Sequence, residues 1–558
     1  EYGHTVGVEA TTGPLGAGMG MAVGMAMAEA HLESVFNKEN YPVVDHYTYV
    51  LGGDGCMMEG ISSEAFSLAG TLGLSKLIVL YDSNRISIEG STDIAFRENV
   101  QERMQAFGFQ TITVEDGNDI DAIGKAIEAA KADTEHPSFI TIKTQIGFGC
   151  PAKQGKASAH GEPLGVENVE ALRKNLNWPS EEPFFVPEEV YKNYSEIAEQ
   201  KAEVEAAWNV MFAAYCEEYP EMEALWNQYH NAKAGEALKD DAGFWAKQEK
   251  PEASRAISGR LINYIKDVLP NLFGGSADLA PSNKTNMKDA GDFSKEDRAG
   301  RNLHFGVREL AMAAIGNGIM LHGGLRAYVS TFFVFSDYCK PMARLSALMG
   351  VPLTYVFTHD SIGVGEDGPT HEPIEQMAAL RAMPNFHVFR PCDATETEAA
   401  WYSAVTSEHT PTALVLTRQN LEPMAGSSRE ALKGGYIIDD CEGTPELILI
   451  ASGSEVALAV HAKETLEAEG QKVRVVSMPC MDLFEEQSEE YKESVLPREV
   501  RRRVAVEALG SFGWDKYTGL DGKIIAMESF GASAPAGLLF KKFGFTVEHV
   551  VEVAKSLK

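Results

Sequence analysis

The sequence predicts an α/β fold made of several successive blocks with parallel sheets. At 558 residues the chain is long enough for several domains, at about 150 residues each. Residues 49–55 and 77–84 are apolar runs that end in small polar residues, and a small-residue helical segment lies between them. The same alternation of strand and helix patterns returns further along the chain, which is typical of parallel sheets.

Polar side chains follow both of these first strands. Asp54 lies among glycines in the run Gly52-Gly53-Asp54-Gly55, and Asn84 ends the second run. The carboxyl ends of parallel strands meet at one sheet edge, where α/β proteins bind ligands. Carboxylate and amide oxygens beside glycines suit Mg2+ held jointly with a diphosphate. A Gly-Asp-Gly run alone is usually an ordinary turn, but the second polar strand end favours a metal–diphosphate site.

The rest of the first block is read from glycine content and charge. Residues 9–30 predict a glycine-rich turn followed by a small-residue helix, and residues 139–142 predict a strand. The glycine-rich loop at 147–165 is long enough to indicate a functional loop. Residues 180–254 are rich in Glu, Lys and Ala, and we expect helices packed on the outside of the first domain, followed by a linker.

Two further blocks follow. In the second, residues 260–268 predict a helix, and strands are expected at 353–358, 387–390 and 413–417. The third begins near residue 435. It shows strand patterns at 446–451, 472–477 and 503–507, a helix opening at 453–455 and a closing helix from 547. Few ionisable groups cluster there, so we expect it to supply structure and dimer contacts.

The composition excludes several classes of protein. The net charge of −32 disfavours binding to nucleic acid or acidic membranes, and no apolar run has the length of a membrane span. The seven cysteines are scattered, odd in number and without a C-x-x-C pair. That pattern disfavours a disulfide scaffold or a zinc site and predicts a reducing compartment, the cytoplasm.

In the second block, Glu309 stands early in an apolar, small-residue helix at 302–319. A carboxyl group in such surroundings has a raised pKa unless it is paired, and can exchange a proton with a ring nitrogen. The alternative is that Glu309 is a favourable charge at the start of the helix or an ion-pair partner for Arg308. Phe332, Phe335 and Tyr338 follow at three-residue spacing. Such a stripe is more often core, but the polar residues 336 and 337 interrupt it and make ring stacking by Phe335 plausible.

Residues 357–376 form a glycine-rich loop with two histidines and several carboxylates after a strand. The spacing matches no usual zinc pattern, and recognition of a polyhydroxy compound fits better. Guanidinium groups bind phosphate in bidentate fashion. The candidates for a phosphate site are Arg255, Ser282, His371 and Arg418.

These motifs, in this order, resemble the transketolase family: TTGPLGAG, GGDGCMMEG, YDSN, GGSADLAPSN, HFGVRE, THDSIGVGEDGPTHEP, FRPCDATE and LTRQNL. The resemblance covers the whole chain to the terminal TVEHVVEVAKSL. It implies an enzyme that uses thiamine diphosphate (ThDP) and Mg2+, with Ca2+ or Mn2+ as alternatives. Such an enzyme moves a two-carbon ketol unit from a ketose phosphate to an aldose phosphate in the pentose phosphate pathway.

The resemblance also implies three α/β domains of the ThDP-binding fold. These are a diphosphate-binding domain with a helical linker at 1–230, N-terminally incomplete, a pyrimidine-binding domain at 231–432 and a C-terminal domain at 433–558. The family forms homodimers in which each active site lies between the first domain of one subunit and the second domain of the other. Glu59 resembles the carboxylate that links the two sites through the interface.

Cofactor roles carry over from the same resemblance. Asp54 and Asn84 would hold the metal by their side chains and Ile86 by its carbonyl oxygen. Glu309 would hydrogen-bond N1′ of the aminopyrimidine and so promote formation of the nucleophilic ylid. The other residues expected to line ThDP are Leu15, Gly55, Asp82, His160, Asp278, Phe332, Phe335 and Tyr338.

Substrate roles carry over as well. His359 and Asp367 would bind the substrate hydroxyls, and His160 would assist proton transfers. The phosphate of the sugar would be held by Arg255, Ser282, His371 and Arg418.

The chain departs from the family in two places. The family has a substantial segment ahead of Glu1, with histidines that contact cofactor and substrates, and Ala157 stands where a second histidine often lies near His160. The alternative to an active transketolase is therefore a truncated, processed or split form. Such a form would bind ThDP but would have weak activity, or none, without a separate N-terminal chain.

Other readings remain at this point. A deoxyxylulose-phosphate synthase uses the same cofactor with the same domain order, but the motifs around Asp278 and His359 favour transketolase. A dihydroxyacetone synthase also shares these features and is harder to exclude. Acetohydroxyacid-synthase-like enzymes place the glutamate-bearing domain first, the reverse of the order here. A non-catalytic ThDP-binding or regulatory protein is the alternative from a different class.

Overall fold

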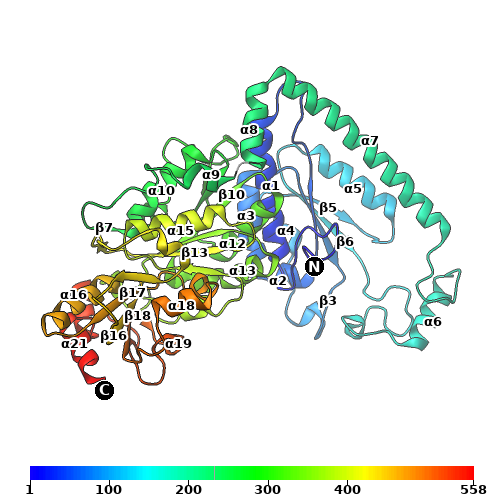
Figure 1. Cartoon of the computed structure of the whole chain (residues 1–558). Helices are drawn as coiled ribbons and strands as arrows, with labels where there is room; N and C mark the ends of the chain where they lie inside the picture. Colours follow the sequence, from blue (N-terminus) through cyan, green and yellow to red (C-terminus); the bar gives the residue numbers. More distant parts are fainter. Residues whose placement is uncertain (232, 558) are drawn as a thin grey trace. The chain divides into compact units, whose positions relative to one another are not determined.

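The computed structural model describes residues 1–231 and 233–557, and the chain divides into two compact units (Figure 1). The amino-terminal unit comprises Thr12–His230 with Ser294–Ala299. The carboxy-terminal unit comprises Glu1–Thr11, Asn231–Phe293 and Gly300–Lys558. Each unit is built on its own parallel sheets.

The amino-terminal unit holds a four-stranded parallel sheet in the order β1-β2-β6-β5. The strands are β1 (Thr48–Gly53), β2 (Leu77–Ser83), β6 (Ser138–Lys143) and β5 (Gln110–Val114). Gly53 pairs in register with Asp82. The polar ends of β1 and β2 therefore lie side by side, as the sequence predicts.

Helices cover both faces of this sheet. On one face, Ala126 and Ala130 of α5 (Ile120–Ala132) pack with Ile78 and Ile140. The adjacent Phe139 points to the opposite face, since side chains alternate along a strand, and there it contacts Phe66 of α3 (Gly60–Leu72). The remaining elements are α1 (Ala17–Phe36), α2 (Asp54–Met58), β3 (Ile86–Ser87), β4 (Gly90–Ser91), α4 (Val100–Ala106) and α6 (Val166–Asn175).

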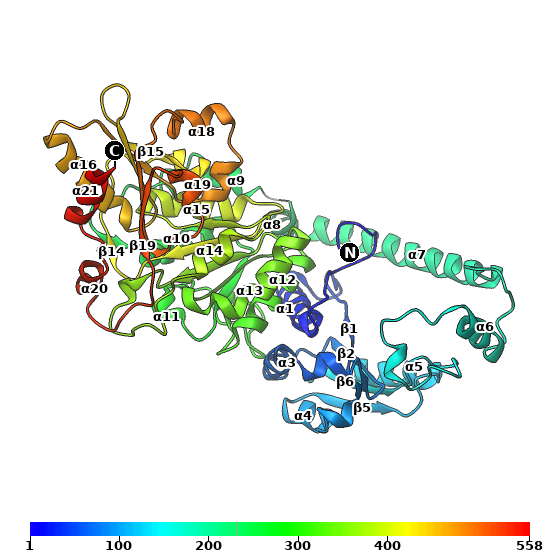
Figure 2. The same ribbon diagram turned by 90° about the horizontal axis from the view of Figure 1, so that it is seen from below.

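The helical region after the first sheet only partly matches the prediction. Helix α7 (Glu188–Glu218) is a single long helix, visible from two sides in Figures 1 and 2, and α8 (Pro220–His230) follows it. Its carboxyl end packs, because Trp208 Nε1 donates to Val43 O at 3.0 Å and Tyr215 Oη to Phe36 O at 2.7 Å. Residues 188–206 are exposed in the described part of the chain, so the expectation that this helix packs along the domain is wrong for its first half.

The carboxy-terminal unit contains a six-stranded parallel sheet in the order β12-β13-β11-β10-β8-β9. The strands are β12 (His387–Phe389), β13 (Thr412–Leu416), β11 (Thr354–Thr358), β10 (Arg326–Phe332), β8 (Leu272–Ser276) and β9 (Asn302–His304). These strands confirm the three expected at 353–358, 387–390 and 413–417.

Four helices sandwich this sheet. Tyr328 and Val356 share a buried cluster with α10 (Ser254–Val268) and α15 (Ala394–Thr406). The opposite face is covered by α12 (Glu309–His322) and α13 (Ser336–Met349), whose small residues allow close approach. A Cβ atom at Gly316 would lie 2.9 Å from Val329 Cγ1, so a larger residue there would push α12 off the sheet.

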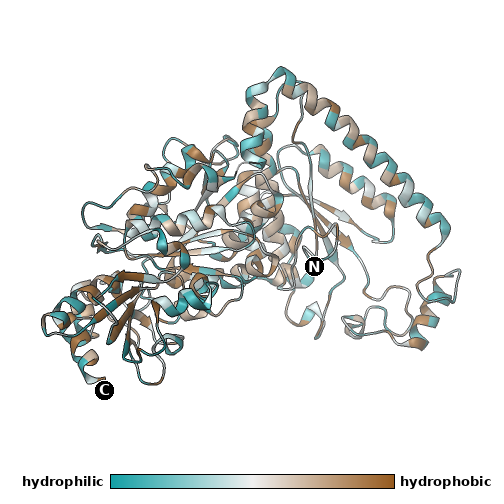
Figure 3. Ribbon diagram, in the orientation of Figure 1, coloured by the Kyte–Doolittle hydropathy of each residue, from teal (hydrophilic) through white to brown (hydrophobic). Residues whose placement is uncertain are grey.

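The same unit carries a second sheet in the order β15-β17-β16-β18-β19, in which only the pairing of β15 with β17 is antiparallel. The strands are β15 (Tyr436–Asp439), β17 (Val473–Ser477), β16 (Leu447–Ala451), β18 (Arg503–Gly510) and β19 (Lys523–Met527). Figure 3 shows these strands as hydrophobic. Alternate residues of β16 enter two separate buried clusters, one on each face.

Helices flank this sheet too. The cluster on one face includes α16 (Glu455–Ala468) and α21 (Val547–Ser556), and the cluster on the other includes α17 (Met481–Glu485), α18 (Glu489–Val495) and α19 (Asp515–Thr518). The remaining elements of the unit are β7 (Glu252–Ala253), α9 (Ala234–Leu238), α11 (Ala280–Asn283), α14 (Gln376–Arg381), β14 (Asn420–Leu421) and α20 (Ala536–Lys542). Over the described residues, no helix combines the length and apolarity needed to cross a membrane.

Candidate active site

The candidate site residues fall into two groups, one in each unit. In the amino-terminal unit, β1 ends at Gly53 and Asp54 begins α2. The Asp54 carboxylate is buried, with 4% of the residue exposed. Tyr81 Oη donates to its Oδ1 at 2.6 Å, and the backbone N–H of Arg85 donates to its Oδ2 at 2.9 Å. The carboxylate is therefore fixed in orientation by groups from the end of β2 and the loop after it.

The loop after β2 is shaped around Asn84. Its Oδ1 accepts a hydrogen bond from Ile86 N at 2.9 Å, and Arg85 adopts a left-handed backbone with φ of 61°. Asp82 accepts a hydrogen bond from Thr144 Oγ1. The side chains of Asp54 and Asn84 thus both accept hydrogen bonds from backbone N–H groups of the short segment 85–86. Carboxylate and amide oxygens are hard donors that fit a divalent cation such as Mg2+.

Glycines leave room beside this site. A Cβ atom at Gly55 would lie 2.8 Å from Leu15 Cδ1, so Leu15 lies directly over Gly55. A Cβ atom at Gly52 would lie 1.8 Å from Met19 Cε. Leu15 itself is 54% exposed, so the rest of its side chain is open to a further contact. The arrangement suits a cofactor that covers the leucine.

Two predicted residues of this unit are not joined to Asp54 by any described contact. Glu59 is exposed and precedes α3, and its side chain makes no capping bond there. His160 is exposed in the long loop, where its backbone N–H donates to Ala157 O at 2.8 Å.

A second acidic cluster in this unit has a different explanation. Glu29, Glu33 and Asp45 bring their carboxylate oxygens close together. The ammonium group of Lys76 lies 2.7 to 3.0 Å from all three. The cluster is therefore a set of ion pairs around a lysine, and it carries no argument for a metal.

The second group lies at the carboxyl ends of neighbouring strands in the six-stranded sheet. Asp278 follows β8, Phe332 ends β10, His359 follows β11 and Arg418 follows β13, and these strands are adjacent in the order β13-β11-β10-β8. Asp278 and His359 both have positive φ, 59° and 64°. A left-handed backbone at a residue other than glycine costs free energy and marks a site where conformation is enforced by the surroundings.

The His359 side chain is held on both ring nitrogens. Thr358 Oγ1 donates to Asn283 Oδ1 at 2.7 Å and lies 2.8 Å from His359 Nδ1. Arg255 Nη1 lies 3.4 Å from His359 Nε2 and also donates to Ser282 O at 2.8 Å. Because Arg255 can only donate and the Thr358 proton is directed to Asn283, these contacts fit a neutral ring with its proton on Nδ1.

The surroundings of His359 are positively charged. Burial lowers the pKa of His359, and the neighbouring charges of Arg255, Arg418 and His371 lower it further, to about 3. Burial and the Arg418 charge also lower the pKa of Arg255. The half-buried Arg255 and the exposed Arg418 thus flank the buried His359, and two guanidinium groups placed in this way are a ready site for an anion such as a phosphate. Ser282 joins this cluster through its backbone carbonyl, which accepts from Arg255.

Aromatic rings extend the cluster. Phe332 lies 3.8 Å from the His359 ring centroid and 6.1 Å from Phe335, with the two phenyl rings nearly parallel. Phe335 also contacts Tyr338 at 6.1 Å and His371 at 5.5 Å between ring centroids. The stripe at 332–338 is therefore partly a lining of the site and not only core.

Glu309 and Asp367 have fewer described contacts with the rest of this group. Glu309 is the first residue of α12, half-buried, and its backbone oxygen accepts a weak bond from Cys339 Sγ at 3.5 Å. Asp367 is exposed in its loop, and none of the described contacts joins it to His359.

A buried charge network behind His359 was not predicted. Arg390 is fully buried, donates from Nε to Asp360 Oδ2 at 2.9 Å and pairs with Glu455. Glu507 accepts two bonds of 2.8 Å from Arg381. The network joins the six-stranded sheet to the five-stranded one and ends at Asp360, the residue after His359. The signal in the sequence was a charged residue, Arg390, at the end of an apolar strand.

Three successive segments of the chain match domain families of known proteins. Residues 1–234 match the thiamine diphosphate binding domain of transketolase, residues 250–424 its pyrimidine binding domain and residues 434–546 the transketolase-like C-terminal domain. The fold and these matches define a thiamine-diphosphate-dependent enzyme with three α/β domains.

Individual relatives identify the family within this class of enzymes. A transketolase from Halalkalibacterium halodurans is 53% identical over 100% of this chain and 84% of its own length, and one from Bacillus subtilis is 52% identical with the same coverage. Among solved structures, a transketolase from Leishmania mexicana superposes with a TM-score of 0.95 at 45% identity, covering 100% of this chain and 83% of that one. The chain belongs to the transketolase family.

Its function is accordingly that of a transketolase, a transferase of ketol groups. The comparisons do not favour the alternative of a split form, because one chain here carries all three domains. A Pichia stipitis transketolase in complex with sedoheptulose-7-phosphate, at 44% identity and a TM-score of 0.93, covers 99% of this chain and 82% of that one.

Proposed function

We propose that the enzyme transfers a two-carbon ketol unit reversibly between sugar phosphates, with xylulose 5-phosphate as a donor and ribose 5-phosphate as an acceptor, in the pentose phosphate pathway. The observation that supports this most is the cationic cluster of Arg255, His371 and Arg418 around a neutral His359 at the strand ends. Such a cluster selects a phosphorylated substrate in a chain whose net charge is −32. The bound sugar phosphate of the Pichia stipitis relative is consistent with this choice.

Asp54, Asn84 and the carbonyl of Ile86 would hold Mg2+ against the diphosphate of ThDP. Gly55, Asp82 and His160 would line the cofactor, and Leu15 would support it from one side, as its position over Gly55 suggests. ThDP supplies, when bound, a nucleophilic carbon that cleaves and re-forms the bond next to a ketose carbonyl. Asp54 serves in anchoring the cofactor, not in the bond-making step.

Glu309 would hydrogen-bond N1′ of the aminopyrimidine and hold the proton there. Its place at the first turn of an apolar helix supports this role. Phe335 would stack on the pyrimidine with Phe332 and Tyr338 beside it, and Asp278 would face the thiazolium side.

The phosphate of the sugar would bind through Arg255, Arg418 and His371, with Ser282 at the same end of the substrate site. His359 and Asp367 would bind the substrate hydroxyls, and His160 would assist proton transfer. His359 would accept a hydrogen bond from a substrate hydroxyl through Nε2, in place of the long 3.4 Å contact with Arg255, because its Nδ1 already faces Thr358.

We propose a homodimer in which Glu59 links the two active sites, with domain boundaries near residues 230 and 432. Because the seven cysteines, all in the described part of the chain, are free thiols, we place the enzyme in the cytoplasm. Light scattering on the purified protein tests the dimer, and a stable monomer at assay concentrations would contradict it.

The direct test is a coupled assay with xylulose 5-phosphate and ribose 5-phosphate in the presence of ThDP and Mg2+. We expect turnover that requires ThDP and that is lost when a chelator removes the divalent metal. Absence of ThDP-dependent turnover would contradict the proposal.

A further inference from the structure

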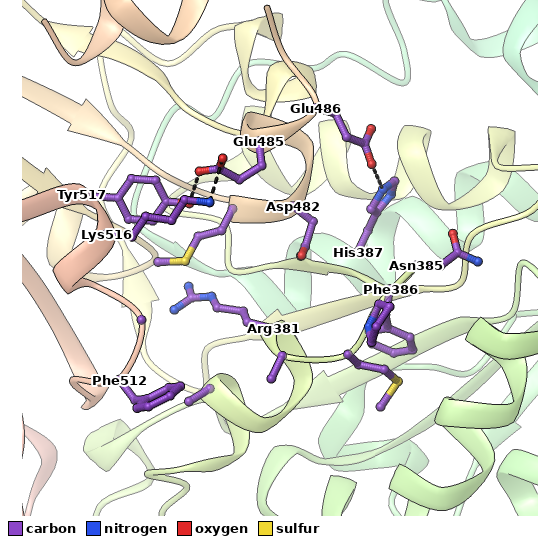
Figure 4. A pocket seen from close by; sticks show the side chains of 16 residues that line it. Arg381, Asn385, Phe386, His387, Asp482, Glu485, Glu486, Phe512, Lys516 and Tyr517 are labelled. Atoms are coloured by element: carbon purple, nitrogen blue, oxygen red, sulfur yellow. Dashed lines mark hydrogen bonds and ion pairs between the residues drawn. The ribbon is translucent and has the colours of Figure 1, made fainter. Parts of the chain in front are cut away.

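A cavity of about 410 Å³ lies inside the carboxy-terminal unit, away from the candidate active site (Figure 4). It is formed by α14 and the segment leading into β12 on one side, and by α17 and residues 512–517 on the other. His387, which lines it, is the first residue of β12. The candidate active-site residues follow the carboxyl ends of β8, β10 and β11, so the cavity opens at the opposite edge of the same sheet. Its volume is within the range of small-molecule sites, about 300 to 1,000 Å³.

Three polar atoms of the lining residues are buried without a hydrogen-bond partner in the described structure: Arg381 Nε, His387 Nδ1 and Asp482 Oδ2. Buried polar groups are normally bonded, and each one left unpaired costs about 1 to 3 kcal/mol. In Figure 4 the Asp482 carboxylate points into the space bounded by Arg381, His387 and Phe512. All three atoms belong to residues that line one cavity, and a bound partner with matching donors and acceptors would satisfy them.

The hydrogen-bond roles of these atoms can be assigned. His387 Nε2 lies 3.2 Å from Glu486 Oε1, and a carboxylate can only accept, so Nε2 carries a proton. In the neutral ring His387 Nδ1 is then an acceptor. Burial raises the pKa of Asp482 to about 6, which leaves it ionised, and an acceptor, at neutral pH. Arg381 Nε is a donor, so the cavity offers two acceptors and one donor.

The ion pairs of the lining residues also favour a ligand with N–H donors. Arg381 is neutralised by its fork with Glu507, and Lys516 pairs with Glu485 at 2.8 Å. The charges of His387 and Arg381 lower the pKa of Asp482 against the effect of burial, but among the described residues neither forms an ion pair with its carboxylate. A ligand that donates an N–H group to Asp482 Oδ2 would therefore supply the hydrogen bond that this atom lacks among the described residues.

Apolar surface completes the lining. Met481 and Tyr517 form part of the wall, and Phe512 is 76% exposed at the cavity. An exposed aromatic ring beside buried polar atoms is a natural platform for a flat ligand ring. A saturated polyol would match the polar atoms but would leave this ring without a stacking partner.

We propose that this cavity is a binding site for an amino-substituted nitrogen heterocycle with the chemistry of a nucleobase. The exocyclic amino group donates to Asp482 and His387, a ring nitrogen accepts from Arg381 Nε, and the ring stacks on Phe512. The site is separate from the ThDP and sugar-phosphate sites and is independent of their assignment.

The test is calorimetric titration of adenine into the enzyme saturated with ThDP and Mg2+, so that the cofactor site is filled. We expect a dissociation constant of about 1 mM or below, as a ligand of this size allows. Purine, which lacks the amino group, should bind at least about tenfold more weakly, because the bond to a charged acceptor is lost.

Two variants localise the binding. Asp482→Asn should weaken adenine binding at least about tenfold, because the amide is a poorer partner for the amino group. Glu490→Gln, the same change of charge at an exposed position of the same domain, should leave binding unchanged. Phe512→Ala, at an exposed ring whose removal empties no core, should weaken binding severalfold and serves if Asp482→Asn does not fold.

Two outcomes would overturn the proposal. One is no adenine binding at about 10 mM, a concentration at which even a weak site would be substantially filled. The other is equal binding by the wild type and both cavity variants. The first result would mean that the enzyme has no such site, and the second that adenine binds outside this cavity.

Discussion

The region around Asp54 and the cluster around His359 are built in different ways. Asp54, Asn84 and Ile86 lie within a short stretch of sequence, and their polar atoms are held by Tyr81 and by the local backbone. His359 is instead surrounded by residues from four segments that lie far apart in the sequence, with a buried charge network behind it. The first region needs a correct loop, whereas the second needs the whole sheet and its junction with the next domain. Mutations should therefore affect the two regions differently.

The largest expected effect is on stability, from Asp360→Ala in the network behind His359. Removing this partner leaves the buried Arg390 with an uncompensated part of its charge, at a cost of about 3 kcal/mol in the free energy of unfolding. Urea titration measures it. Asp267→Ala, which removes an exposed partner of Lys266, should cost less than about 0.5 kcal/mol. If the two variants were equally stable, the network would not support this region.

The next effect is on cofactor affinity. Asp54→Ala should weaken ThDP binding in the presence of Mg2+ at least about a hundredfold, because it removes the one anionic side chain among the proposed metal ligands. Calorimetry with ThDP at fixed Mg2+ measures this, and Asp121→Ala, an exposed carboxylate on α5, is the control. Unchanged affinity in the Asp54 variant would remove it from the metal site.

A smaller effect is expected for the phosphate cluster. Arg418→Ala should raise KM for the sugar phosphate about tenfold or more with little change in kcat, because the guanidinium binds a group remote from the reacting carbons. Arg498→Ala, at a 77% exposed arginine, should leave both constants unchanged. A fall in kcat without a change in KM would indicate a different role for Arg418.

The effect that is smallest at neutral pH is the dependence of stability on pH. His359 has a pKa of about 3 when folded, whereas an unfolded histidine titrates near about 6.5, so the unfolded state binds the extra proton between these values. Stability from this residue is thus complete above pH about 6.5 and declines as the pH falls toward about 3.

Histidine NMR measures this titration. The His359 ring should remain neutral at pH about 5, whereas a histidine of ordinary pKa is largely protonated there. His461 provides the comparison: partial burial lowers its pKa, but its hydrogen bonds to the carboxylates of Glu464 and Glu422 outweigh this and raise it. Protonation of both rings over the same pH range would contradict the description of the His359 pocket.

The comparison also explains how much the sequence could predict. The three α/β blocks, the order of motifs and the Asp54–Asn84 pair follow from local patterns, because strand ends and glycines are visible in short stretches. The contact of Arg255 with His359 depends on sheet order, and the bond of Arg255 to the Ser282 carbonyl involves a backbone atom that side-chain reasoning does not consider. The Arg390 network joins two sheets and could not be read from either alone.

The central claim is that the Asp54 region anchors the cofactor while Glu309 activates it. The measurement that tests this most directly is hydrogen–deuterium exchange at C2 of ThDP bound to Glu309→Ala. We expect ThDP affinity close to that of the wild type and exchange slowed at least about a hundredfold, the typical contribution of a positioned acid–base group. Exchange as fast as in the wild type would contradict the account.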